Sequence, residues 1–172
     1  MGETALIFAV PAAEPLVERF RGKYDSSAAV GVPAHVTLLY PFLAPAAVGA
    51  SEIAALTTLF ASARAFEVVF RRCARFGDRV LYLAPEPEAP LLCLMRRIWA
   101  RWPEAPPYAG TIPRDAVRPH LTVSDSVTGE HLDRIDLAVA GGLPIATRID
   151  EAQLIENRTG RWTMRATFPL GG

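Results

Sequence analysis

One order of elements occurs twice in this chain: a short strand that opens with His-x-Thr, then a helix, then a hairpin. From His35 to the glycine of the first hairpin, Gly77, is 42 residues, and from His120 to the matching Gly160 is 40. Equal order and near-equal spacing indicate an internal duplication with pseudo-twofold symmetry. Hairpins require antiparallel pairing, and helices stand between them, so the sequence predicts an α+β fold.

Apolar periodicity and the positions of proline and glycine divide the whole chain into elements. The pattern predicts helices over 12–25, 50–64, 89–102 and 128–140, and strands over 4–10, 35–40, 65–76, 79–84, 120–125, 144–156 and 161–170. Ser51 is the expected N-cap of the second helix. The segment 144–156 is expected to be one long strand.

Each His-x-Thr motif places two polar side chains on the same side of a strand, because residues two apart point to one face. His35 and Thr37 therefore project together. His120, Thr122 and, by the same parity, Ser124 project together in the second copy. If the two copies are related by a pseudo-twofold axis, the two polar sets can face each other across one groove.

Two imidazoles that face each other can perform paired proton transfers, because imidazole titrates near neutral pH. In phosphodiester cleavage an oxygen nucleophile loses a proton and a leaving oxygen gains one, on opposite sides of phosphorus. Threonine hydroxyls can donate hydrogen bonds to the non-bridging phosphate oxygens. The doubled motif therefore predicts metal-independent cleavage of a phosphodiester.

The paired HVTL (35–38) and HLTV (120–123), the proline before the second motif and the closing GRWTMRATFPLG resemble the two-histidine (2H) phosphoesterase superfamily, in particular its 2′-5′ RNA ligase and 2′,3′-cyclic phosphodiesterase branch. The resemblance implies one domain over 1–172, made of two pseudo-symmetric lobes, each an antiparallel sheet flanked by helices, around a central cleft. It implies His35 and His120 as the acid–base pair and Thr37 and Thr122 as phosphate-binding hydroxyls, with no metal or organic cofactor. Which histidine is the base stays open.

Further side chains near the motifs are candidate substrate contacts. Tyr40 and Ser124 are the expected substrate-binding residues; Phe42, Tyr108 and Trp162 could also stack on a base, although core or rim packing is the commoner role of such aromatics. Arginines form a second set of candidates, for which solvated surface charge is the competing interpretation: Arg71, Arg72, Arg75, Arg118, Arg158 and Arg161. His131, on a polar helix without a threonine two residues on, is expected to be solvent-exposed.

The charge balance limits the class of ligand. Eighteen basic and eighteen acidic residues give a formal net charge of zero, whereas proteins that hold long nucleic acid usually show a basic excess. A small nucleotide or an RNA end is the expected partner. The chain shows no signal-peptide pattern and no apolar run of membrane-spanning length, and Cys73 and Cys93 lack metal-type spacing. We expect a cytoplasmic protein without membrane association, and a monomer.

The expected reaction opens a 2′,3′-cyclic phosphate to a 2′-phosphomonoester with water as nucleophile; reversible 2′-5′ joining of RNA ends is the same chemistry with a ribose hydroxyl. Two alternatives stay open. One is a non-catalytic protein that binds nucleotides or RNA ends on the same fold, and the other is an interaction domain with both histidines in its core. Zinc binding lacks a third ligand at suitable spacing, and a serine hydrolase lacks the G-x-S-x-G motif.

Overall fold

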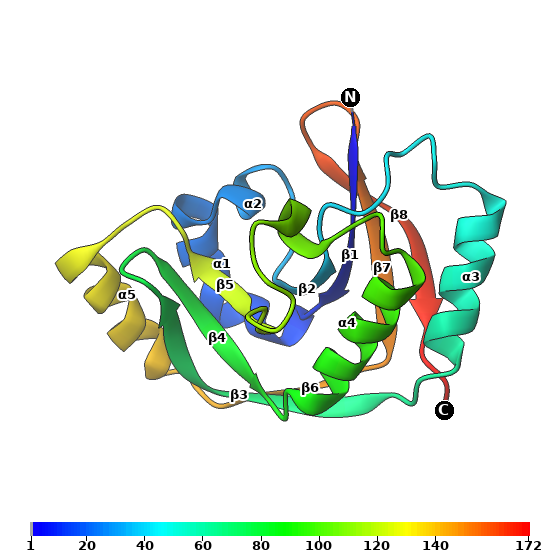
Figure 1. Cartoon of the computed structure of the whole chain (residues 1–172). Coiled ribbons are helices and arrows are strands. Elements are labelled where there is room, and N and C mark those ends of the chain that lie inside the picture. Colours follow the sequence, from blue (N-terminus) through cyan, green and yellow to red (C-terminus); the bar gives the residue numbers. More distant parts are fainter. Residues whose placement is uncertain (1) are drawn as a thin grey trace.

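The computed structural model describes residues 2–172 (Figure 1). Its strands are β1 (Glu3–Ala9), β2 (His35–Leu39), β3 (Phe66–Phe76), β4 (Val80–Glu86), β5 (Leu121–Ser124), β6 (Ile145–Ile149), β7 (Glu151–Asn157) and β8 (Trp162–Pro169). Its helices are α1 (Glu14–Tyr24), α2 (Ser26–Ala29), α3 (Ala50–Ala61), α4 (Ala89–Arg101) and α5 (Gly129–Ala140), with 3-10 turns at Pro11–Ala13 and Pro107–Gly110. None of the helices in this part of the chain combines the length and apolar character that crossing a membrane requires.

The strands form two four-stranded sheets with matching orders, β2-β1-β7-β8 and β5-β4-β3-β6. Every pairing within them is antiparallel. Each motif strand lies at an edge, and the strand that precedes it in the chain lies beside it. The third strand of each sheet comes from the other copy: β7 follows β5 in the chain, and β3 follows β2. The predicted α+β fold of two antiparallel sheets with flanking helices is confirmed, and the two copies exchange strands.

Helices connect the two halves in a matching way. The helix between β1 and β2, α1, lies against β5 of the opposite sheet, and the helix between β4 and β5, α4, lies against β2. The Trp99 indole N–H of α4 donates a 3.1 Å hydrogen bond to the Leu38 carbonyl oxygen of β2. One apolar cluster includes buried side chains from both sheets. The helices therefore hold the two edge strands, which bear the motifs, in fixed places.

Three sequence-based predictions are wrong in detail. The segment 144–156 is two strands, because the chain leaves β6 and enters β7 in the other sheet at Asp150. No proline or glycine within 145–156 marks this change of sheet in the sequence. Ser51 lies inside α3, whose N-cap is Gly49. His131 is half-buried rather than exposed, with its Nε2 3.0 Å from the Tyr24 hydroxyl oxygen and its ring edge-on to that tyrosine.

Candidate active site

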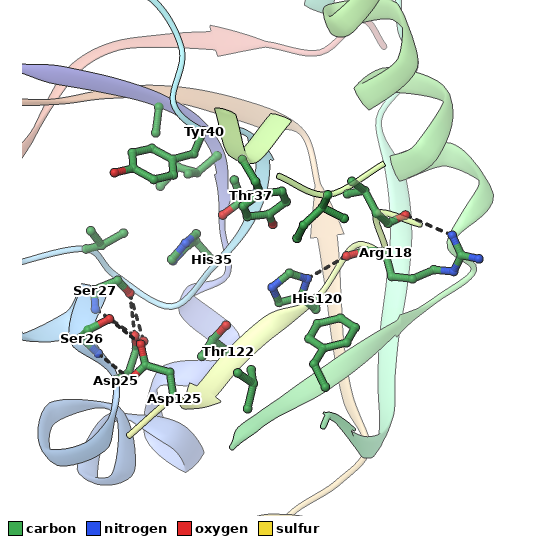
Figure 2. Close-up of a pocket in the computed structure, with 18 of the residues that line it drawn as sticks. Asp25, Ser26, Ser27, His35, Thr37, Tyr40, Arg118, His120, Thr122 and Asp125 are labelled. Atoms are coloured by element: carbon green, nitrogen blue, oxygen red, sulfur yellow. Dashed lines mark hydrogen bonds between the residues drawn. The ribbon is translucent and has the colours of Figure 1, made fainter. Parts of the chain in front are cut away.

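The two His-x-Thr motifs line one cavity of about 690 Å³. Figure 2 shows the rings of His35 and His120 directed toward this shared space, with Thr37 and Thr122 beside them. All four side chains are half-buried, so they can reach a ligand while the surrounding protein excludes much of the water. The structure thus brings together all four residues that the sequence pairs as a site.

The two motif strands have the same backbone construction. Thr37 and Leu39 of β2 pair with the adjacent residues Ile7 and Leu6 of β1, so β2 has one more residue than β1 at this point. In the same way, Thr122 and Ser124 of β5 pair with the adjacent residues Tyr82 and Leu81 of β4. The extra residue is therefore the third after the histidine in both copies, which is the arrangement of a β-bulge. Residues 35–39 and residues 120–124 also share one order of burial: half-buried, buried, half-buried, buried, buried.

This bulge explains why Ser124 does not line the cavity. Strict alternation predicts that Ser124 shares a face with His120 and Thr122, but the extra residue ends the alternation one position earlier. Ser124 is fully buried, and its hydroxyl is the one buried side-chain polar group without a hydrogen-bond partner in the described part of the chain.

Each histidine ring is oriented by the same backbone contact. Nδ1 of His35 lies 2.7 Å from the Pro33 carbonyl oxygen, and Nδ1 of His120 lies 2.7 Å from the Arg118 carbonyl oxygen. A carbonyl only accepts, so Nδ1 bears the proton in each ring and Nε2 is the acceptor of the neutral tautomer. Nε2 is therefore the atom of each ring that can exchange a proton with a ligand.

Burial keeps both rings neutral at neutral pH. It lowers the pKa of His35 from 6.5 to about 4; the hydrogen bond to Pro33 opposes this effect, and the positive charge of Arg21 adds to it. Burial also lowers the pKa of His120, against the opposing effect of the Arg118 carbonyl. The cause is that a ring removed from water disfavours its charged form.

A charged cluster lies close to His35. The guanidinium of Arg21 donates to the Asp25 carboxylate at 2.8 Å and to the Val32 carbonyl at 3.1 Å, and both charged side chains are almost completely buried. Asp25 also accepts from the Ser27 backbone N–H and lines the cavity. The sequence did not indicate this cluster, because an Arg and an Asp four residues apart on a helix usually form an exposed pair.

Aromatic rings surround His120 instead. Phe76 stands edge-on to the His120 ring, with ring centroids 4.9 Å apart, and stacks on Tyr82 at 4.2 Å. The ring centroids of Tyr82 and His120 are 5.5 Å apart. The two histidines thus make the same kind of backbone contact but have different neighbours: His35 has a charged pair nearby, and His120 has aromatic rings. Phe76 also lines the cavity, although sequence reasoning placed it only in a hairpin.

Three of the four aromatic candidates line the cavity: Tyr40, Tyr108 and Trp162. The Tyr40 hydroxyl donates to Glu3 at 3.1 Å, and its ring stands edge-on to Trp162. The Tyr108 backbone N–H donates to the Tyr40 carbonyl at 2.6 Å, from a turn in which Tyr108 has a φ of 52°. Non-glycine residues in this left-handed region are uncommon and strained. The fourth candidate, Phe42, packs in the core against Trp102.

Most of the candidate arginines lie elsewhere. Arg71 and Arg72 approach Glu86, Arg75 pairs with Asp133 and Asp136 of α5, and Arg158 pairs with Glu156. Arg161 is exposed and outside the cavity lining. Arg118 is among the lining residues, but its guanidinium donates to the Asp115 and Val117 carbonyls. No three or more His, Cys, Asp and Glu side chains gather as a metal-binding group within residues 2–172.

Comparison with known proteins identifies a family for this chain. The family model of the "2′-5′ RNA ligase superfamily" matches residues 9–161. A Bacillus pumilus (strain SAFR-032) protein with a provisional phosphoesterase name is 26% identical over 162 residues, which cover 92% of this chain and 91% of that protein.

Solved structures share the fold at low sequence identity. The crystal structure of E. coli LigT complexed with 3′-AMP has a TM-score of 0.63 at 18% identity, covering 98% of this chain and 97% of that chain. TT0787 of Thermus thermophilus has a TM-score of 0.59 at 17% identity, covering 99% and 98%. E. coli LigT complexed with NADP+ has a TM-score of 0.60 at 18% identity, covering 99% and 98%.

The family match, together with the shared fold of two antiparallel sheets, places the chain in the class of the two-histidine phosphoesterases. Within that class, the chain belongs to the 2′-5′ RNA ligase superfamily.

Proposed function

We propose that this chain is a metal-independent phosphodiesterase that opens 2′,3′-cyclic phosphates of small nucleotides or RNA ends to 2′-phosphomonoesters. The observation that supports it most is the matched orientation of His35 and His120, whose Nδ1 atoms are both held by backbone carbonyls at the wall of one cavity. Each ring thereby keeps Nε2 for proton exchange, as a two-sided acid–base reaction at phosphorus requires.

The reaction has a balanced path through these residues. A water oxygen attacks phosphorus and gives its proton to the Nε2 of the neutral histidine. The bond from phosphorus to the 3′ oxygen breaks, and this oxygen takes a proton from the Nε2 of the other, protonated histidine. The hydroxyls of Thr37 and Thr122 donate to the non-bridging oxygens, on which negative charge increases in the transition state. A ribose 5′-hydroxyl in place of water gives the 2′-5′ joining reaction by the same proton transfers, and the reverse of that step cleaves the 2′-5′ linkage.

Nucleotide binding is supported by the relatives and by the lining. E. coli LigT has been crystallised with 3′-AMP, with NADP+ and with ATP. In this chain the aromatic rings of Tyr40 and Trp162 offer a surface on which a base can stack beside the phosphate position. Tyr40 is therefore proposed as a substrate-binding residue, and the cytoplasmic location and role in RNA processing stay predictions.

Hydrolysis of a nucleoside 2′,3′-cyclic monophosphate in the presence of EDTA tests the proposal, with phosphorus NMR to identify the product. We expect a 2′-phosphomonoester, formed at an unchanged rate when the chelator is added. His35→Ala and His120→Ala should each reduce the rate by about 10²–10⁴-fold. His131→Ala is the matched control, because His131 lies outside the cavity lining. Turnover that stops with EDTA, or that survives both cavity substitutions, contradicts the mechanism.

Binding without turnover is the competing outcome. If the wild-type chain binds the cyclic nucleotide but leaves it intact, and the binding survives replacement of both histidines, the fold serves as a nucleotide-binding or RNA-end-binding module instead.

A further inference from the structure

The cavity offers very little positive charge to a ligand. Among the described residues that line it, Arg118 is the only lysine or arginine. Its guanidinium donates to the Asp115 carbonyl at 2.8 Å and to the Val117 carbonyl at 3.1 Å. Figure 2 shows the Arg118 side chain directed away from His35 and His120. Apart from the two imidazoles, a phosphate therefore meets no cationic side chain of the lining directed at it.

Two carboxylates line the same cavity, Asp25 and Asp125. Asp25 is balanced by the buried guanidinium of Arg21, which it contacts at 2.8 Å. Asp125 accepts hydrogen bonds from the Ser26 backbone N–H, at 3.1 Å, and from the Ser26 hydroxyl. It forms no ion pair with any cation of residues 2–172. Asp125 is thus a negative charge at the cavity wall that only neutral groups contact.

The remaining walls are mainly apolar. Ile7, Val32 and Ile155 line the cavity from the first sheet and its flanking segment, and Phe76, Ile112 and Val117 line it from the other side. Apolar walls lower the local dielectric, which lengthens the reach of an unbalanced charge. Beyond the place for one phosphate, the cavity therefore presents apolar surface and a carboxylate, and neither favours a second phosphate.

We infer that this site, if it acts as proposed above, prefers cyclic phosphodiesters that carry a single negative charge, and that Asp125 disfavours substrates with a further phosphate. Free nucleoside 2′,3′-cyclic monophosphates belong to the accepted class. RNA ends and 5′-phosphorylated nucleotides bear another phosphate on the 5′ oxygen of the same ribose. In this cavity that phosphate meets the Asp125 carboxylate without a cation to offset the repulsion. Asp125 acts in this account as a specificity-determining residue rather than as an acid or a base.

The test compares two substrates that differ by one phosphate: adenosine 2′,3′-cyclic monophosphate and its 5′-phosphorylated form. For the wild-type chain, kcat/KM with the cyclic monophosphate should be about tenfold or more higher than with the 5′-phosphorylated form. This difference is expected for repulsion between like charges in a partly desolvated cavity. Asp125→Asn should reduce this preference several-fold, by raising kcat/KM for the 5′-phosphorylated substrate. Asp150→Asn is the matched control: Asp150 is exposed in the turn between β6 and β7, outside the cavity lining.

Equal or better use of the 5′-phosphorylated substrate by the wild-type chain overturns the inference and leaves the proposed reaction standing. A preference that Asp125→Asn does not change removes Asp125 from the account. Failure to hydrolyse either substrate overturns the proposed function itself. In that case displacement of a fluorescent nucleotide by adenosine 2′-phosphate and by adenosine 2′,5′-bisphosphate still decides the charge selectivity: weaker displacement by the bisphosphate supports it, and equal or stronger displacement contradicts it.

Discussion

His35 and His120 make the same hydrogen bond: each ring, from a different sheet, donates from Nδ1 to the carbonyl oxygen two residues before it, over 2.7 Å. The match means that the backbone of each motif strand fixes both the tautomer and the orientation of its own histidine. Neither ring therefore needs a third side chain to orient it, in contrast to a triad in which a carboxylate performs that task.

The rate should depend on pH with an optimum on the acidic side. The proposed reaction needs one neutral and one protonated imidazole, but burial lowers both pKa values, that of His35 from 6.5 to about 4. Above pH 6.5 both rings are neutral in the free protein, so the general acid is missing. We expect kcat/KM to fall by about tenfold for each pH unit above that range. A profile of kcat/KM that is flat, or that is highest in alkaline solution, contradicts the pairing.

Binding of a phosphate ligand should be accompanied by proton uptake. An anion between the rings favours the charged imidazole and so raises pKa values that burial has lowered. Calorimetric titration of a nucleoside 2′-monophosphate at neutral pH, in buffers of different ionisation enthalpy, should show protons taken up by the complex. The His35→Gln, His120→Gln double variant should bind without this uptake, and uptake of the same size in that variant points to other groups.

Thr37→Val and Thr122→Val should each reduce kcat by about 10²-fold, because each removes one hydrogen-bond donor to the phosphate oxygens while keeping the shape of the side chain. The two motifs are built alike, so the two effects should be similar. Thr167→Val is the control, since Thr167 is an exposed residue of β8 outside the cavity. Wild-type kcat in both cavity variants, with normal thermal unfolding, contradicts the role of the hydroxyls.

Asp25→Ala should destabilise the fold by about 3–5 kcal/mol, because it leaves the Arg21 guanidinium buried without its counter-ion. Arg158→Ala removes a pair with Glu156 in which the arginine side chain is 57% exposed; its loss should cost at most about 1 kcal/mol. Urea unfolding of the two variants measures both values. Similar small losses would mean that the buried pair is not important for stability.

Ser124→Ala should stabilise the protein by about 1 kcal/mol or leave its stability unchanged. The Ser124 hydroxyl is fully buried without a hydrogen-bond partner in the described structure, and removal of such a group ends a desolvation cost. The same variant should keep its turnover, because Ser124 does not line the cavity. A clear loss of kcat would return Ser124 to the substrate-binding residues expected from strand parity.

The doubled His-x-Thr pattern predicted that both motifs face one groove, and the resemblance to the two-histidine phosphoesterases implied two lobes that each hold an antiparallel sheet. The exchange of strands between the sheets could not be predicted, because no proline or glycine within 145–156 marks the point at which the chain passes from one sheet to the other. Parity was correct as far as Thr122 and wrong at Ser124, since a bulge changes hydrogen-bond register without a signal in residue type. Register is a property of two strands, and one sequence segment does not specify it.

The charged side chains beside the cavity were also missed, for a different reason. Arg21 and Asp25 are spaced as an ordinary surface pair on a helix, and only the packing of α1 against β5 buries them. Asp125 lies three residues after Thr122, and the equivalent position of the first copy, five residues after His35, is Tyr40 rather than an acid. The features that distinguish this site from a symmetric one therefore come from tertiary packing.

The most direct test of the central claim is a crystal structure of the chain with a nucleoside 2′-monophosphate. We predict that its phosphate lies between the two imidazoles, with the Nε2 atoms of His35 and His120 each within hydrogen-bonding distance of an oxygen on the same phosphorus atom. A phosphate that contacts only one of the rings, or that binds outside the cavity, would contradict the account.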